Sequence, residues 1–160
     1  MKAAIFNAII DTLKADTTLV GYLGGPYVFR AQKIAPARIP SVTVRMVGET
    51  SHMRTGFTQV KTAPIPHTIL RFKQSTITVK VWVSSQHTGF PQTGADSDLI
   101  ADHIEDILLD STNFPTGPAG DTESTHAWNK VSETQMHEDE KELWCNTMRF
   151  TFEYHEDTAP

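Results

Sequence analysis

The 160-residue sequence has one cysteine, Cys145, and it has no long apolar run. One cysteine cannot form an internal disulfide, and it excludes a zinc site built from several thiolates. No segment approaches the roughly 18 consecutive apolar residues that a membrane span requires. The first residues soon reach Asn7 and Asp11, unlike the apolar core of a secretory signal. We therefore expect a soluble domain, made in a reducing compartment and without membrane contact.

Signatures of catalysis are also missing. The sequence has no G-x-S-x-G elbow, and Gly24-Gly25-Pro26 lacks the spacing of a phosphate-binding loop. Cys145 lies in an expected strand beside Trp144 and Asn146, and neither neighbour would activate a thiol. We predict a non-enzymatic protein that has no catalytic residue and needs no cofactor.

The histidines and acidic runs do not follow a metal-binding pattern. None of the seven histidines has a ligand spacing, and the residue one helical turn after His103 is Ile107. We interpret His103 as a semi-buried histidine. The acidic run at 138–142 lacks the glycine and the 12-residue schedule of an EF-hand. We predict no metal site; a small enzyme or metal-binding module that uses His103 with Asp106, or the 138–142 acids, is the minor alternative.

Charge is distributed unevenly along the chain. Residues 1–90 carry 11 basic and 3 acidic side chains, a formal charge of +8, whereas residues 91–160 carry 3 basic and 16 acidic side chains, a formal charge of −13. Two interpretations are open. The halves could interleave and mix their charges, or the molecule could have unlike faces that suit head-to-tail contact between copies.

Hydrophobic periodicity predicts a single α+β domain over residues 1–160. An antiparallel β-sheet carries two amphipathic helices on one face. Alternating rather than continuous apolar residues argue against a doubly wound parallel sheet. We expect helices that end near 16 and span 95–109, and strands at 27–29, 41–47, 76–84, 126–135 and 143–154.

Two segments fall outside this pattern. Between 48 and 75 the periodicity is lost, and Gly56, Pro64 and Pro66 interrupt the chain. A structureless segment of this length is uncommon inside a compact domain, so we expect a protruding loop or hairpin arm there, with 58–61 and 69–72 as its legs. We also expect a short flexible C-terminal tail at 156–160.

The arm and an acidic turn supply candidate contacts with other subunits. Basic and aromatic side chains alternate in the arm, which would suit a phosphate backbone or a neighbouring subunit. Because the whole chain is acidic, with a formal charge of −5, we favour the subunit. The candidate interface residues are Arg54, Phe57, Lys61, Arg71, Phe72, Lys73, Glu138, Asp139 and Glu140.

The order of these elements resembles the tail terminator (tail completion) proteins of tailed bacteriophages. The resemblance covers most of the chain except the arm and the last residues. It rests on FNAIIDTLKAD (6–16), the proline-preceded strand IPSVTV (39–44), TVKVWVSS (78–85), the helix IADHIEDILL (100–109) and a terminal hairpin.

The resemblance implies a structural virion protein at the head–tail junction, assembled in the host cytoplasm. Members of the family form a ring, commonly a hexamer, on the last ring of tail-tube protein. They stop tube polymerisation and present a docking surface to the head connector, while DNA passes through the lumen without specific binding. The long insertion at 48–75 departs from the family pattern, which leaves a neck, head-closure or minor tail protein as the alternative.

Overall fold

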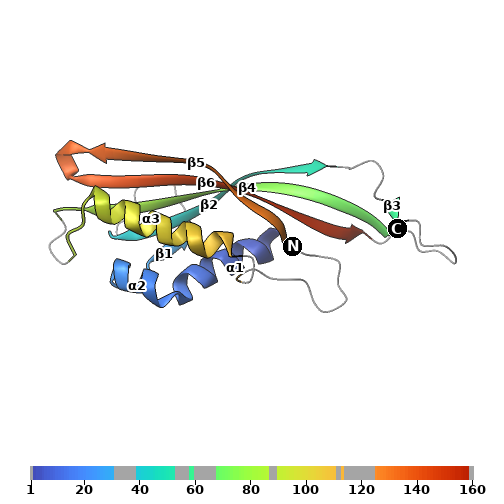
Figure 1. Cartoon of the computed structure of the whole chain (residues 1–160), viewed down its shortest axis with the longest axis horizontal. Helices are drawn as coiled ribbons and strands as arrows, with labels where there is room; N and C mark the ends of the chain where they lie inside the picture. The colour runs from blue at the N-terminus through green and yellow to red at the C-terminus, as the bar shows by residue number, and fades with distance from the viewer. Residues whose placement is uncertain are drawn as a thin grey trace.

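A β-sheet with helices on one of its faces forms the architecture (Figure 1). The computed structural model describes residues 2–30, 39–52, 58–59, 68–86, 90–110, 113 and 125–158. In chain order the elements are α1 (Lys2–Ala15), α2 (Thr17–Leu23), β1 (Val28–Arg30), β2 (Ser41–His52), β3 (Thr58–Gln59), β4 (Thr68–Ser84), α3 (Gly94–Leu109), β5 (Thr125–Glu138), a 3₁₀ turn (Asp139–Lys141) and β6 (Leu143–Thr158).

The sheet is mixed, and its strand order is β1-β2-β4-β6-β5, with β3 paired to β4. Strand β1 runs parallel to β2, with Val28 opposite Val42, and the other pairs are antiparallel. The α+β class is confirmed. The expectation of a wholly antiparallel sheet was wrong at one edge, because the chain enters β2 in the same direction as β1. Within the described strands the sheet stays open, with β1 and β5 at its edges.

The described residues form three α-helices, whereas periodicity predicted two. The additional helix is α2, whose residues were assigned to neither a helix nor a strand from the sequence. The Asp16 side chain accepts a hydrogen bond from the N–H of Leu19 at its start, and Gly24 ends it in the left-handed region at φ 72°. Its buried Leu19 and Leu23 pack into the core. Two good caps and two buried leucines therefore stabilise a seven-residue helix that would be too short to form alone.

The predicted helix at 95–109 is confirmed as α3, which begins one residue earlier. Thr93 and Asp96 form a capping box, in which the N–H of Thr93 donates to the Asp96 carboxylate at 2.8 Å. Its inner stripe contains Ile100, Ile104 and Leu108, all buried against the sheet. A negative side chain in the first turn also suits the positive end of the helix dipole.

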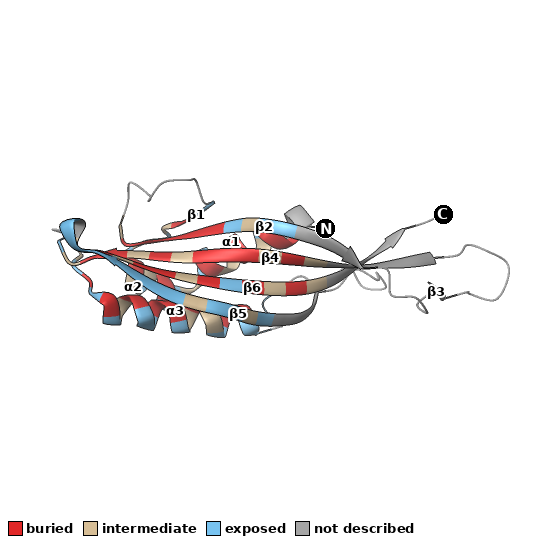
Figure 2. Cartoon of the chain, turned by 90° about the horizontal axis from the view of Figure 1, so that it is seen from above, coloured by how far each residue is buried: buried red, intermediate tan, exposed pale blue. Residues whose placement is uncertain are grey.

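The core lies between the helices and one face of the sheet, as the buried stretches of the strands in Figure 2 indicate. Alternate residues of the central strands face the helices, as the period of two requires. Opposite one another in the register are Ile77 and Phe150, and likewise Val79 and Met148, all fully buried. The aliphatic side chains of the strand predicted at 76–84 and the aromatic side chains of the strand predicted at 143–154 thus meet in one core.

The central strands extend beyond their predicted bounds into the segment expected to be an arm. Residues 48–52 belong to β2 and 68–75 belong to β4, and Ser51 lies opposite Lys73. The pairing of Thr58 with Ile69 joins parts of the two predicted hairpin legs. Strand β6 continues to Thr158, so most of the predicted tail at 156–160 is paired with β4. Backbone hydrogen bonds extend these strands without any need for an apolar pattern.

Candidate interaction surfaces

The predicted interface residues of the arm are divided by the structure. Arg71, Phe72 and Lys73 lie in β4 and pair with β6, and Phe72 and Lys73 also pair with β2. Arg54, Phe57 and Lys61 lie outside the described residues. The backbone positions of 71–73 therefore place part of the predicted basic segment at one end of the sheet.

The predicted acidic residues lie at the other end of the sheet. Glu138 ends β5, and Asp139 and Glu140 form the exposed 3₁₀ turn that leads to β6. Asp139 also lies 2.9 Å from Nδ1 of His137. Ser84 of β4 lies opposite Leu143, next to the acidic turn. The 13 residue steps of β4 from Arg71 to Ser84 correspond to about 40 Å at 3.3 Å per residue. Within one chain, the described residues 71–73 of the basic segment therefore lie far from the acidic turn.

Helix α3 carries a concentrated negative charge. Its sequence contains five acidic residues and neither lysine nor arginine. Asp102 and Asp106 are exposed, whereas Glu105 is half-buried toward β5. An acidic helix face is usually solvated, but Glu105 departs from that pattern because it contacts Lys130 of β5.

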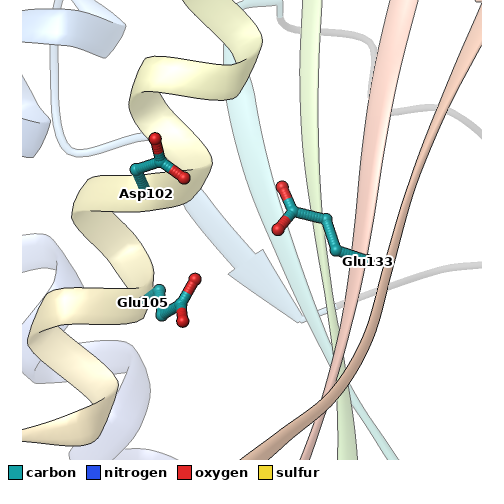
Figure 3. Close-up of side chains that lie close together, drawn as sticks. All are labelled: Asp102, Glu105 and Glu133. Carbon is teal, nitrogen blue, oxygen red and sulfur yellow. The ribbon is translucent and has the colours of Figure 1, made fainter.

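Three carboxylates gather between α3 and β5 (Figure 3). Asp102 and Glu105 come from α3 and Glu133 from β5, and oxygen atoms of all three lie within 4.8 Å of one another. The Lys130 ammonium contacts Glu105 and lies 2.7 Å from Glu133. These hydrogen bonds, first to Glu105 and then to Glu133, raise the pKa of Lys130 above its ordinary value.

The chemistry of this cluster favours an ion-pair network. Carboxylate oxygens are ligands for hard cations, but here the Lys130 ammonium already lies between Glu105 and Glu133. The ion pair between Glu105 and Lys130 links α3 to β5, although the two residues are 25 positions apart in the sequence. Neither Lys130 nor Glu133 was singled out from the sequence, because no spacing rule relates a strand residue to a helix so far away.

A buried polar seam continues from this network. Asn146 is fully buried in the middle of the otherwise apolar face of β6. Its carbonyl oxygen accepts from Ser97 Oγ at 2.7 Å and from Gln135 Nε2 at 2.9 Å, and its amide donates to Asp98 at 2.8 Å. Buried polar groups are costly unless paired, so the seam fixes the position of α3 on the sheet.

His103 and Cys145, the two residues considered for metal binding or catalysis, both pack against neighbouring side chains. The Nε2 atom of His103 lies 2.8 Å from Asp16 Oδ1, and its ring makes an edge contact with Tyr22. This confirms the interpretation of His103 as semi-buried. Burial raises the pKa of the Cys145 thiol, and smaller opposing contributions come from Thr147 and Lys80. A protonated, buried thiol suits packing rather than nucleophilic attack.

A groove runs between α1 and the edge strand β1. It is lined by Asn7, Ile10, Asp11, Lys14, Val28, Phe29 and Arg30. Arg30 crosses it to donate to the side-chain oxygen of Asn7 and lies 4.9 Å from the centre of the Phe6 ring. The groove carries both acidic and basic side chains, and Arg30 is already bonded to Asn7. The lining therefore does not indicate which class of ligand the groove would bind.

The face of the sheet opposite the helices carries cations. Because Ile77 and Val79 face the core, Thr78 and Lys80 face away from it. The register places Arg45 and Arg149 on either side of Thr78, and both arginines are exposed. Figure 2 looks onto this face, with the helices behind the sheet. The cations on this face come from both halves of the sequence, since Arg45 and Lys80 belong to residues 1–90 and Arg149 to residues 91–160.

These features define a two-layer α+β protein with a mixed sheet and opposite charges on its two faces. Its fold is similar to that of a chain in the virion of a native gene transfer agent particle. The two chains are 13% identical and superpose with a TM-score of 0.61 over 97% of each chain. No protein-family model and no curated protein matches the sequence. Among the described residues, no helix has the length and apolar character needed to cross a bilayer.

Proposed function

We propose that this chain is a structural virion protein that forms a ring of six copies at the head-proximal end of a phage-like tail tube. In this role it stops tube polymerisation and offers the docking surface for the head connector. DNA passes through the lumen without specific binding. The chain acts as a building block and not as an enzyme.

The observation that carries this proposal is the shared fold with a virion chain over 97% of both chains. Agreement over nearly the full length of both chains supports a role as a building block of a particle. The residue pattern of the helices and strands supports the same role independently, through its resemblance to tail terminators.

The layout of the surfaces also supports assembly. Cations lie on the helix-free face of the sheet, and five acids lie on α3 in the opposite layer. Unlike surfaces on opposite sides of one chain suit head-to-tail contacts, which close into rings when each copy is rotated relative to the last.

Tube-length control tests the proposal directly. Tail-tube protein encoded beside this chain would be polymerised with and without it, and tube lengths and ends would be scored by negative-stain electron microscopy. We expect shorter tubes, each with a ring on one end. Tubes of unchanged length would contradict the terminator role. Binding to the head connector but not to the tube end would indicate the neck or head-closure alternative.

A further inference from the structure

We propose that the helix-free face of the sheet binds the outer face of α3 on a second copy of this chain. Arg45, Arg149 and Lys80 of one copy would pair with Asp102 and Asp106 of the next. This inference rests on the proposed ring and names the surfaces that join its subunits.

The cationic surface is compact. Arg45 and Arg149 lie on the two strands that flank β4, so their Cα atoms are about 10 Å apart. Lys80 lies on β4, two residues after Thr78 and on the same face. Neither arginine forms an ion pair with any side chain that the structure describes. The described acids of this face, Glu138 and Glu153, lie at least four residues along the strands from the arginine row.

The acidic surface has a matching size. Asp102 and Asp106 are one turn apart on α3 and exposed, and neither has an ion-pair partner among the described side chains. Leu99 and Leu109 continue the same stripe at helical spacing, and they are 50% and 43% exposed. The stripe from Leu99 to Leu109 is about 15 Å long.

Exposed apolar side chains flank the charges on the sheet as well. Phe29 on β1 lies in the same cross-strand row as Lys80, and Met136 on β5 lies in the row of Trp82. Both are exposed, Met136 to 69%. These positions are four strand spacings apart, about 19 Å across the strands, compared with about 15 Å for the α3 stripe. Each of the two surfaces therefore combines exposed charged side chains with exposed apolar side chains.

A second copy fits this face better than nucleic acid does. A phosphate backbone would pair with the arginines, but it has no counterpart for Phe29 and Met136. The α3 stripe offers both acids and leucines. Because the two surfaces lie on opposite layers, each copy uses both of them, and the contact repeats from copy to copy.

Charge exchange provides the test. Sheet variant Arg45→Glu/Arg149→Glu and helix variant Asp102→Lys/Asp106→Lys would be studied by sedimentation velocity at concentrations where the unmodified chain associates. We expect each double variant to weaken self-association at least about tenfold, because like charges then face each other. The fourfold variant and the equimolar mixture of the two double variants should both recover, since each restores opposite charges at every contact.

Matched variants separate charge from folding. Arg45→Lys/Arg149→Lys keeps the charge and should associate like the unmodified chain, and thermal unfolding followed by circular dichroism would show whether each variant folds. If a reversal variant unfolds, the milder Arg45→Gln/Arg149→Gln and Asp102→Asn/Asp106→Asn should still weaken association.

The outcomes distinguish this interface from the ring itself. Rings that form normally in both reversal variants would overturn the interface and leave the proposed function intact. An unmodified chain that stays monomeric with and without tail-tube protein would overturn both. Binding of duplex DNA that is lost in Arg45→Glu/Arg149→Glu, with self-association unchanged, would make this face a nucleic-acid contact instead.

Discussion

The carboxylate of Asp16 lies 2.8 Å from the imidazole of His103 and joins the start of α2 to α3. The same carboxylate accepts the N–H of Leu19 at 2.7 Å. Partial burial would raise the pKa of Asp16, but the hydrogen bonds from His103 and Leu19 and the attraction of the imidazole outweigh burial and lower the pKa below its ordinary value.

Replacing Asp16 should separate its two roles. Asp16→Ala removes the cap and the His103 contact and should cost about 1–2 kcal/mol of unfolding free energy. Asp16→Asn keeps an oxygen for Leu19 and should cost less. The folded-state pKa is lowered, so the charge stabilises the fold above the unfolded pKa near 3.8 and this benefit is lost as the pH falls through the folded pKa. Urea titrations from pH 5 to 3 should show the advantage over Asp16→Asn shrinking; a constant difference would contradict the pairing.

Removing the Lys130 ammonium should leave Glu105 and Glu133 without their shared partner. Lys130→Met keeps the aliphatic stem, and because the pair is about one-quarter exposed we expect a loss of only about 1 kcal/mol. Adding Glu105→Gln and Glu133→Gln to this variant should recover most of the lost unfolding free energy, as measured by chemical denaturation. EDTA should leave the melting temperature of the unmodified chain unchanged, since Lys130 supplies the positive charge between these carboxylates.

Truncating Asn146 should be more costly than its size suggests. Asn146→Ala leaves the buried hydroxyl of Ser97 without its acceptor and should destabilise the fold by about 1–3 kcal/mol. Ser97→Ala serves as the matched variant, and the double variant should cost less than the two single costs combined. Additive costs in equilibrium unfolding would show that the two side chains do not depend on each other.

Adding a methyl group at Gly94 should displace Trp144. A Cβ there would lie 2.7 Å from the indole ring, which stacks on His137 with 3.8 Å between ring centroids. Gly94→Ala should therefore destabilise the fold by about 1–3 kcal/mol and change the near-ultraviolet circular dichroism of the tryptophans. In a Trp144→Leu background the same substitution should be neutral or stabilising, because alanine has the higher helix propensity. An equal cost in both backgrounds would exclude the clash.

The long helices and strands could be predicted from the sequence, because their apolar residues recur with the period of the side that is buried in the core. The stripe of α3 and the alternation of Ile77 with Val79 require one buried face and one polar face, whatever packs against them. The short helix α2 gave no such signal, since seven residues span only two turns. Its caps at Asp16 and Gly24 and the burial of Leu19 are what make it stable.

The sequence showed that the two halves of the chain differ in charge, but it did not show where these charges lie in the folded molecule. Backbone pairing sets β4 beside β6, so Arg45, Arg149 and Lys80 come to share one face although more than 100 residues separate the first two. The β5–β6 register shifts between Lys130 and Ser132, and Lys130 and Glu133 both turn toward α3, where they meet Glu105. Local periodicity is enough to specify helices, strands and their buried sides, because it depends on neighbours along the chain. Which charges become neighbours depends on strand order and register, which arise only when distant segments pack together.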